Sequence, residues 1–175
     1  MYSYESDFVS AADALFERVR DEVPWTDQMA SRRTASVGVP YIYRGATYPV
    51  RDWLPVLEDL RCAVANAVGF VPTNCLMNYY PTGRHSLGWH QDDIDILRPK
   101  TGIAIVSLGA ARPLRLRRHI PEGYHYETLE LEPGSLLYMT QEMQSVWQHS
   151  LRRSEGAGAR ISLTFRNIVA SPDST

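Results

Sequence analysis

A length of 175 residues and a hydrophobic fraction of 44% suit one domain built around a single core. The sequence contains no apolar run of the roughly 18 residues that a membrane span needs and no signal-peptide pattern, which predicts a cytoplasmic protein without a membrane partner. A net charge of -2 and a pI near 6.2 exclude a uniformly basic surface. Local arginine clusters remain as either solvated faces or a rim that contacts phosphates; they are Arg32-Arg33, the run from Arg112 to Arg118, and Arg152-Arg153.

Two amphipathic helices are predicted in the first half of the chain. Apolar residues recur at helical spacing over 7–20 and again over 52–69, where Gly69 can end the helix. Between them, residues 37–50 predict a hairpin or loop. Cys62 and Cys75 do not form a C-x-x-C pair, and we expect both to be small core hydrophobes.

From Asn74 onward the sequence changes to short β-prone runs separated by Gly and Pro. Helices followed by strands favour an α+β fold in which the helices cover one face of a sandwich or jelly-roll barrel. We expect a single domain over 1–175, with a helical and hairpin part at 1–73 and a β core at 74–170. The region 111–127 is short, which leaves little room for an elaborate loop that grasps a strand.

The residues with the clearest chemistry are His90, Asp92 and His149. Two imidazoles and one carboxylate leave coordination positions open on an Fe(II) ion, as an oxygenase needs. His90 and Asp92 are two apart and therefore project to the same side of an extended strand. His-x-Asp alone is a weak signal, but downstream the residues Arg160, Ser162, Thr164 and Arg166 share one face of a predicted strand.

Taken together, these motifs resemble those of the AlkB-type Fe(II)/2-oxoglutarate-dependent dioxygenases. The likeness covers about residues 33–168 and is closest to the DNA-repair branch that acts on double strands. It is carried by the following segments: Asn78 to Gly83, His90 to Asp93, Ile103 to Ala110, Pro133 to Leu137, His149 to Leu151, and Arg160 to Arg166. The resemblance implies a double-stranded β-helix, a jelly roll that holds the metal at its open end.

The resemblance also implies roles for individual residues. His90, Asp92 and His149 would bind Fe(II), and Arg160 would pair with the distal carboxylate of 2-oxoglutarate, because a guanidinium fork matches a carboxylate. Asn78 and Tyr80 would assist Arg160, while Thr164 and Arg166 would lie beside the cosubstrate nearer the metal. The implied reaction uses O₂ to hydroxylate an N-methyl group on a base. The hydroxylated methyl group is then released as formaldehyde.

A base in a duplex must be flipped out to reach such a metal. By the same resemblance, Tyr43 and secondarily Tyr41 would stack on the flipped base, Asp93 would approach its edge, and Arg33 would contact a phosphate. Trp89 is expected in the core. Ile94 stands where the nearest relatives tend to carry Glu, which leaves the identity of the substrate open.

Three functions remain in competition at this point. The first is an oxidative demethylase of N-alkylated bases in DNA or RNA, with methylated nucleic acid as its partner and the chain acting as a monomer. The second is a 2-oxoglutarate-dependent hydroxylase or demethylase of a protein side chain, a lipid or a specialised metabolite. The third is a cupin-like module that binds metal without turnover.

Overall fold

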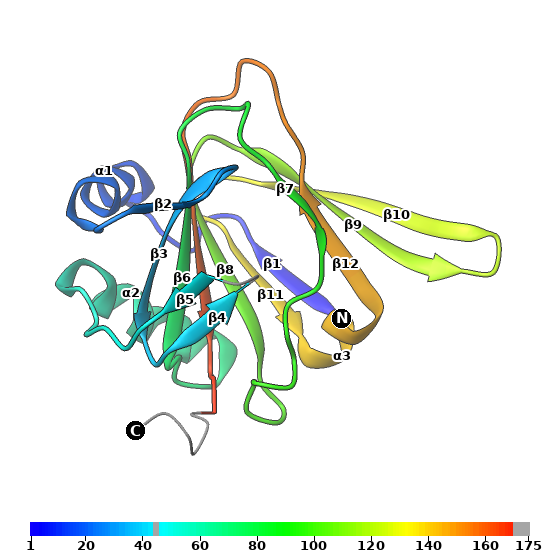
Figure 1. Ribbon diagram of the computed structural model, residues 1–175, viewed down its shortest axis with the longest axis horizontal. Helices are drawn as coiled ribbons and strands as arrows, with labels where there is room; N and C mark the ends of the chain where they lie inside the picture. The colour runs from blue at the N-terminus through cyan, green and yellow to red at the C-terminus, as the bar shows by residue number, and fades with distance from the viewer. Residues whose placement is uncertain (44–45, 170–175) are drawn as a thin grey trace.

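Two antiparallel β-sheets face each other and form the body of the protein (Figure 1). The computed structural model describes residues 1–43 and 46–169, except for the side chains of Tyr43 and Ala46. The larger sheet has seven strands in the order β1-β11-β8-β13-β6-β3-β2, and the smaller has four in the order β10-β9-β12-β7. A separate pair is formed by β4 (Tyr41–Tyr43) and β5 (Ala46–Tyr48).

The strands of the larger sheet are β1 (Tyr2–Glu5), β2 (Thr26–Met29), β3 (Arg32–Gly38), β6 (Asn74–Tyr80), β8 (Gly102–Gly109), β11 (Leu136–Thr140) and β13 (Arg160–Arg166). Those of the smaller sheet are β7 (Leu87–His90), β9 (Arg112–Ile120), β10 (Gly123–Leu131) and β12 (Trp147–Leu151). Because β1, β2 and β3 join the larger sheet, the prediction that helices precede all the strands is wrong.

Helices α1 (Ala12–Glu22) and α2 (Pro55–Val68) lie on the outer face of the seven-stranded sheet, as predicted (Figure 1). Proline in the first turn and the left-handed Gly69 after the last turn fix the ends of α2. Helix α1 begins five residues later than the predicted start at residue 7. Its preceding segment is held instead by the amide of Val9, which donates to the carbonyl of Gly134. A third helix, α3 (Gln141–Val146), was not predicted.

Strand alternation divides the interior into two layers. One core cluster, with Val106, Leu163 and Phe165, packs the larger sheet against α1 and α2. A second cluster, with Ile105 and Leu116, fills part of the space between the two sheets. The polar residues of β6 and β13 also face this inter-sheet space, so the sheet that packs on the helices also forms one wall of a pocket.

Two smaller expectations need correction. Cys75 is buried as predicted, but Cys62 is exposed on α2. The region 111–127 is not a short connection, because β9 and β10 pair over nine residues each and form a ribbon that projects from the body (Figure 1). Among the described residues, no helix has the length and apolar character needed to cross a bilayer.

Candidate active site

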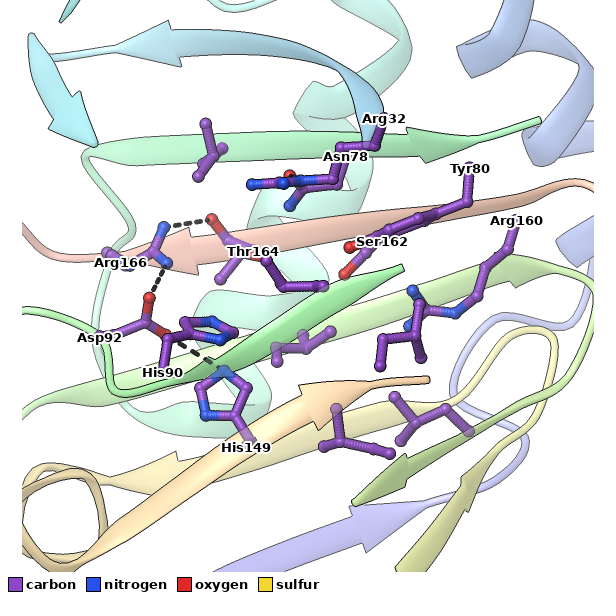
Figure 2. Close-up of a pocket in the computed structure, with 16 residues that line it drawn as sticks. Arg32, Asn78, Tyr80, His90, Asp92, His149, Arg160, Ser162, Thr164 and Arg166 are labelled. Atoms are coloured by element: carbon purple, nitrogen blue, oxygen red, sulfur yellow. Dashed lines mark hydrogen bonds and ion pairs between the residues drawn. The ribbon is translucent and has the colours of Figure 1, made fainter. Parts of the chain in front are cut away.

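The pairing of β7 with β12 brings two histidines together. His90 ends β7 and His149 lies in the middle of β12, and the two residues are direct partners in the antiparallel register. Their ring centroids are 4.1 Å apart. Asp92 follows β7 on the same side, and its Oδ2 lies 3.9 Å from Nε2 of His149. All three side chains line one pocket between the sheets (Figure 2).

Asp92 also forms a buried ion pair with Arg166 at the end of β13. Nη2 of Arg166 donates to Oδ1 of Asp92 at 2.8 Å, and both side chains are almost fully buried. Burial alone would raise the pKa of Asp92, but Arg166 and the two imidazoles outweigh it and lower that pKa to about 2. The carboxylate is therefore ionised at neutral pH.

The surroundings of the two histidines suit metal binding. Burial, reinforced by His90, lowers the pKa of His149 to about 3, so its imidazole is uncharged at neutral pH. Nδ1 of His90 lies 2.9 Å from the carbonyl oxygen of Gly88. Because a carbonyl only accepts, Nδ1 is the donor in this hydrogen bond, and Nε2 is the ring nitrogen that would bind a metal.

Arg160 lies at the other end of the pocket from Asp92 (Figure 2). Its Nη2 donates to Oγ of Ser107 at 2.9 Å, and its guanidinium carbon is 5.6 Å from the centre of the Tyr80 ring. Within the described part of the chain it forms no ion pair with a carboxylate, and its buried Nε has no hydrogen-bond partner. Burial lowers the pKa of Arg160 to about 10. A buried cation of this kind needs an anion, and a ligand carboxylate would supply one.

Arg32 was missed by the sequence analysis, which selected its neighbour Arg33. The side chain of Arg32 is buried in the pocket, and its Nε donates to Oδ1 of Asn78 at 2.6 Å. Arg33 faces the opposite side of β3, where it is exposed and pairs with Asp27. Strand alternation therefore gives Arg32 the inward position and Arg33 the outward one, and the phosphate contact of Arg33 stays a prediction.

Gln144 of α3 was also missed, because the helix itself was not predicted. Its Oε1 accepts from the backbone amide of Asp92 at 3.3 Å, and its backbone carbonyl accepts from the side chain of Gln91 at 2.8 Å. The side chain is buried. Gln144 thus fixes the loop that presents Asp92.

The predicted substrate contacts lie outside this pocket or outside the described residues. Tyr41 is 3% exposed, and the guanidinium of Arg166 lies 4.9 Å from its ring centre, so its ring is part of the core and offers no stacking surface here. Asp93 is exposed and accepts from the amide of Asp95. The side chain of Tyr43 lies outside the described residues. Trp89, expected in the core, is half-buried on the outer face of the smaller sheet, opposite His90.

The donor set fits Fe(II), although Asp92 and His149 lie farther apart than adjacent ligands of one ion. Adjacent ligands on one ion lie about 3 Å apart, since each donor is about 2.1 Å from the metal. The separation of 3.9 Å between His149 and Asp92 is about 1 Å too long, and within residues 1–43 and 46–169 no group of His, Cys, Asp or Glu meets the spacing of a metal site. The two imidazoles, the ionised carboxylate and Arg160, which forms no ion pair with a carboxylate of the described residues, are nevertheless the groups that a metal and a dicarboxylate need.

Known proteins share both this sequence pattern and this fold. Residues 8–166 match the 2OG-Fe(II) oxygenase superfamily. The chain is 33% identical to rat alpha-ketoglutarate-dependent dioxygenase alkB homolog 3 over 92% of its own length and 61% of that protein. It is 35% identical to mouse DNA oxidative demethylase ALKBH2 over 90% of its length and 75% of that protein.

Solved structures agree with this pattern at the level of the fold. The structure of OsALKBH1 superposes with a TM-score of 0.60 at 18% identity, covering 95% of this chain and 97% of that one. A prolyl-4-hydroxylase from Pseudomonas putida gives a TM-score of 0.55 at 18% identity, covering 96% and 93%.

The chain belongs to the 2OG-Fe(II) oxygenase superfamily, and its reaction accordingly requires Fe(II), 2-oxoglutarate and O₂. Within that superfamily it is an AlkB-type member, as the relatives from rat and mouse indicate. It spans less than two thirds of the length of the rat relative.

Proposed function

We propose that this chain is an Fe(II)- and 2-oxoglutarate-dependent oxidative demethylase of N-alkylated bases in DNA or RNA, releasing formaldehyde, succinate and CO₂. The observation that carries the proposal is the pocket with His90, Asp92 and His149 at one end and the unpaired Arg160 at the other. The similarity to a protein named as a DNA oxidative demethylase supports nucleic acid as the substrate.

In this proposal the two sheets form a double-stranded β-helix and one catalytic domain, with Fe(II) held by His90, Asp92 and His149. When bound, Fe(II) couples the oxidative decarboxylation of 2-oxoglutarate to hydroxylation of the substrate carbon. Burial keeps the imidazole of His149 neutral, the carbonyl of Gly88 orients the ring of His90, and Arg166 keeps Asp92 ionised and oriented. The carboxylate of Asp92 and the imidazole of His149 therefore need no proton loss before metal binding.

Arg160 would bind the distal carboxylate of 2-oxoglutarate. Its guanidinium has a buried Nε without a partner among the described residues, and Ser107 and Tyr80 orient the rest of the side chain. Asn78 lines the same wall and is held by Arg32. Thr164 lies between Arg160 and Arg166 on β13, where it would contact the cosubstrate nearer the metal.

The substrate side of the proposal depends on the hairpin of β4 and β5. We infer that Tyr43 stacks on a base brought to the metal and that Asp93 approaches the edge of that base. Tyr41 would act by supporting Arg166, against which its ring packs. Methylated nucleic acid is the proposed partner, and the chain would act on it as a monomer.

A coupled assay tests the proposed function. Purified protein with Fe(II), ascorbate and 2-oxoglutarate is given oligonucleotides that carry 1-methyladenine or 3-methylcytosine, and both succinate and formaldehyde are measured. We expect the two products in equal amounts, with the unmodified oligonucleotide as the control. Turnover of small molecules or peptides without formaldehyde, and none of oligonucleotides, would reject this function in favour of a hydroxylase.

A further inference from the structure

The outer face of the four-stranded sheet carries arginines and aromatic side chains that the pocket does not use. We call this set the arginine-aromatic patch; it consists of Trp89, Arg115, Arg117, Tyr124, Tyr126 and Arg152. The register of the strands explains why these side chains lie close together. Arg117 is paired across the sheet with Tyr126 on β10 and with Gln148 on β12, so all three project to one side. Leu114 and Leu116 take the other side, toward the core.

Arg117 lies at the centre of the patch between two rings. Its guanidinium carbon is 4.4 Å from the centre of Trp89 and 4.5 Å from the centre of Tyr124. Nε of Arg117 donates to Oε1 of Gln148 at 2.7 Å, which fixes the plane of the group. Its remaining N–H donors suit the oxygens of an anion such as phosphate.

The charge of the patch is not balanced by neighbouring acids. Among the described residues, Arg115, Arg117 and Arg152 form no ion pair with a carboxylate, whereas the exposed Arg18, Arg20 and Arg33 each do. Of the described residues on this face of β10, only Glu130 carries a carboxylate. It lies opposite Pro113, at the end of β10 away from Tyr124 and Tyr126. The patch is therefore a local cationic surface on a chain whose net charge is negative.

The aromatic side chains leave much of their surface open to solvent. Tyr124 is 45% exposed and Tyr126 is 48% exposed, on the ribbon that projects from the body (Figure 1). Aromatic rings beside cations are the combination on which unpaired bases stack, since every base has a flat face and duplex bases are already stacked on each other. A double-stranded substrate would contact only the arginines of the patch, because its bases could not stack on the tyrosine rings.

The patch lies on the same strands as the candidate active site. Trp89 adjoins His90 in sequence, and Gln148 adjoins His149, so the patch lies on the reverse side of the strands that carry the histidines. A surface pocket lies beside the patch and is lined by Gln91, Arg117, His119, Tyr124, Val146 and Gln148; Gln91 lies between His90 and Asp92 in sequence. A strand that leaves the site past Gln91 would meet the patch directly.

We propose that the arginine-aromatic patch binds the unpaired nucleotides that flank the target base, with guanidinium groups on the phosphates and tyrosine rings on the bases. This inference rests on the proposed function and narrows its substrate class to single-stranded nucleic acid. It predicts that long single strands bind more tightly than short substrates or duplexes.

The test measures binding by fluorescence anisotropy and turnover by formaldehyde release. The probes are oligodeoxythymidine with one 1-methyladenine, the RNA of the same sequence, the duplex form, and the isolated methylated nucleoside triphosphate. In Arg117→Ala and in the double variant Tyr124→Ala/Tyr126→Ala we expect about 10-fold weaker binding of both single strands. Turnover of the nucleoside triphosphate should stay unchanged. The slope of log K against log salt should become shallower by about 0.7 in Arg117→Ala only, because one phosphate contact is lost.

Two kinds of control separate binding from folding. Arg18→Ala removes an equal charge from the distant helix α1 and should leave single-strand binding unchanged. Tyr124→Phe/Tyr126→Phe keeps the rings and should restore binding. If both patch variants bind the long strands as wild type does, the inference is wrong, although the proposed function stands. If wild type neither binds nor demethylates any of the probes, both are wrong.

Discussion

Asp92 and Arg166, which are 74 positions apart in sequence, form a buried ion pair in which Nη2 lies 2.8 Å from Oδ1. The pair joins the loop after β7 to the end of β13, and therefore connects one sheet to the other at the candidate metal site. Burial opposes the charge on Arg166, but Asp92 raises the pKa of that guanidinium further above its usual range. Each charge is thus tolerated in the interior because the other is present.

Removing only the carboxylate should therefore cost stability as well as metal binding. We expect Asp92→Ala to lower the free energy of unfolding of the metal-free protein by about 3–5 kcal/mol, because Arg166 is left buried without its partner. His90→Ala should cost less, since no charge is stranded. Urea denaturation of both variants in the presence of a chelator measures the difference. Equal losses would mean that the ion pair is not important for stability.

A double variant separates the two roles of Asp92. Asp92→Leu combined with Arg166→Met removes both charges and should recover much of the stability lost in Asp92→Ala. It should remain inactive in the succinate assay, because the carboxylate ligand is missing. Recovery of turnover would show that Asp92 does not bind the metal.

Replacing Arg160 should not lower the stability of the protein without 2-oxoglutarate, in contrast to replacing Asp92. Its guanidinium is buried without a carboxylate from the described residues, so we expect Arg160→Met to leave the free energy of unfolding unchanged or higher. The same change should raise KM for 2-oxoglutarate about 100-fold, as expected when a buried charge pair with a ligand is lost. Initial rates of succinate formation at varied 2-oxoglutarate give KM. Thermal melting with and without 2-oxoglutarate measures the stability, and the ligand should stabilise wild type alone.

Neighbouring arginines on β3 offer a paired comparison. Arg32→Ala should destabilise the protein by about 1.5–3 kcal/mol, because it removes a buried charged donor to Asn78. Arg33→Ala should change stability by less than about 0.5–1 kcal/mol, since its ion pair with Asp27 is exposed. Chemical denaturation of the two variants side by side distinguishes them. A larger effect from Arg33 would contradict the assignment of inward and outward faces.

Gln144 acts on the metal site through the loop that carries Asp92, and is therefore a positioning residue. We expect Gln144→Ala to weaken Fe(II) binding by about 10–100-fold with little loss of secondary structure, because the amide of Asp92 loses its acceptor. Ser145→Ala on the exposed side of α3 serves as the control. Anaerobic metal titration of both variants makes the comparison, and equal affinities would rule the role out.

The sequence predicted best those features that depend on strand alternation. Arg160, Thr164 and Arg166 face the pocket while Leu163 and Phe165 face the helices, as period-two spacing requires. The same rule distinguishes Arg32 from Arg33, but only when the register of β3 is known. Register depends on pairing with β6, a long-range contact that local spacing does not reveal.

Other features could not be predicted from the sequence because they depend on tertiary packing. Helix α3 is only six residues long, too short for a periodic pattern, so Gln144 could not be linked to Asp92. Trp89 was expected in the core, yet it packs against Arg117 on the outer face. The Asp92–Arg166 pair likewise joins strands whose neighbourhood only the fold defines.

Direct metal binding tests the central claim most plainly. Anaerobic calorimetric titration of Fe(II) into the protein with saturating 2-oxoglutarate should show a single site in wild type. His90→Ala and His149→Ala should lose that site while keeping the wild-type circular dichroism spectrum. Fe(II) binding of undiminished affinity in both histidine variants would contradict the account.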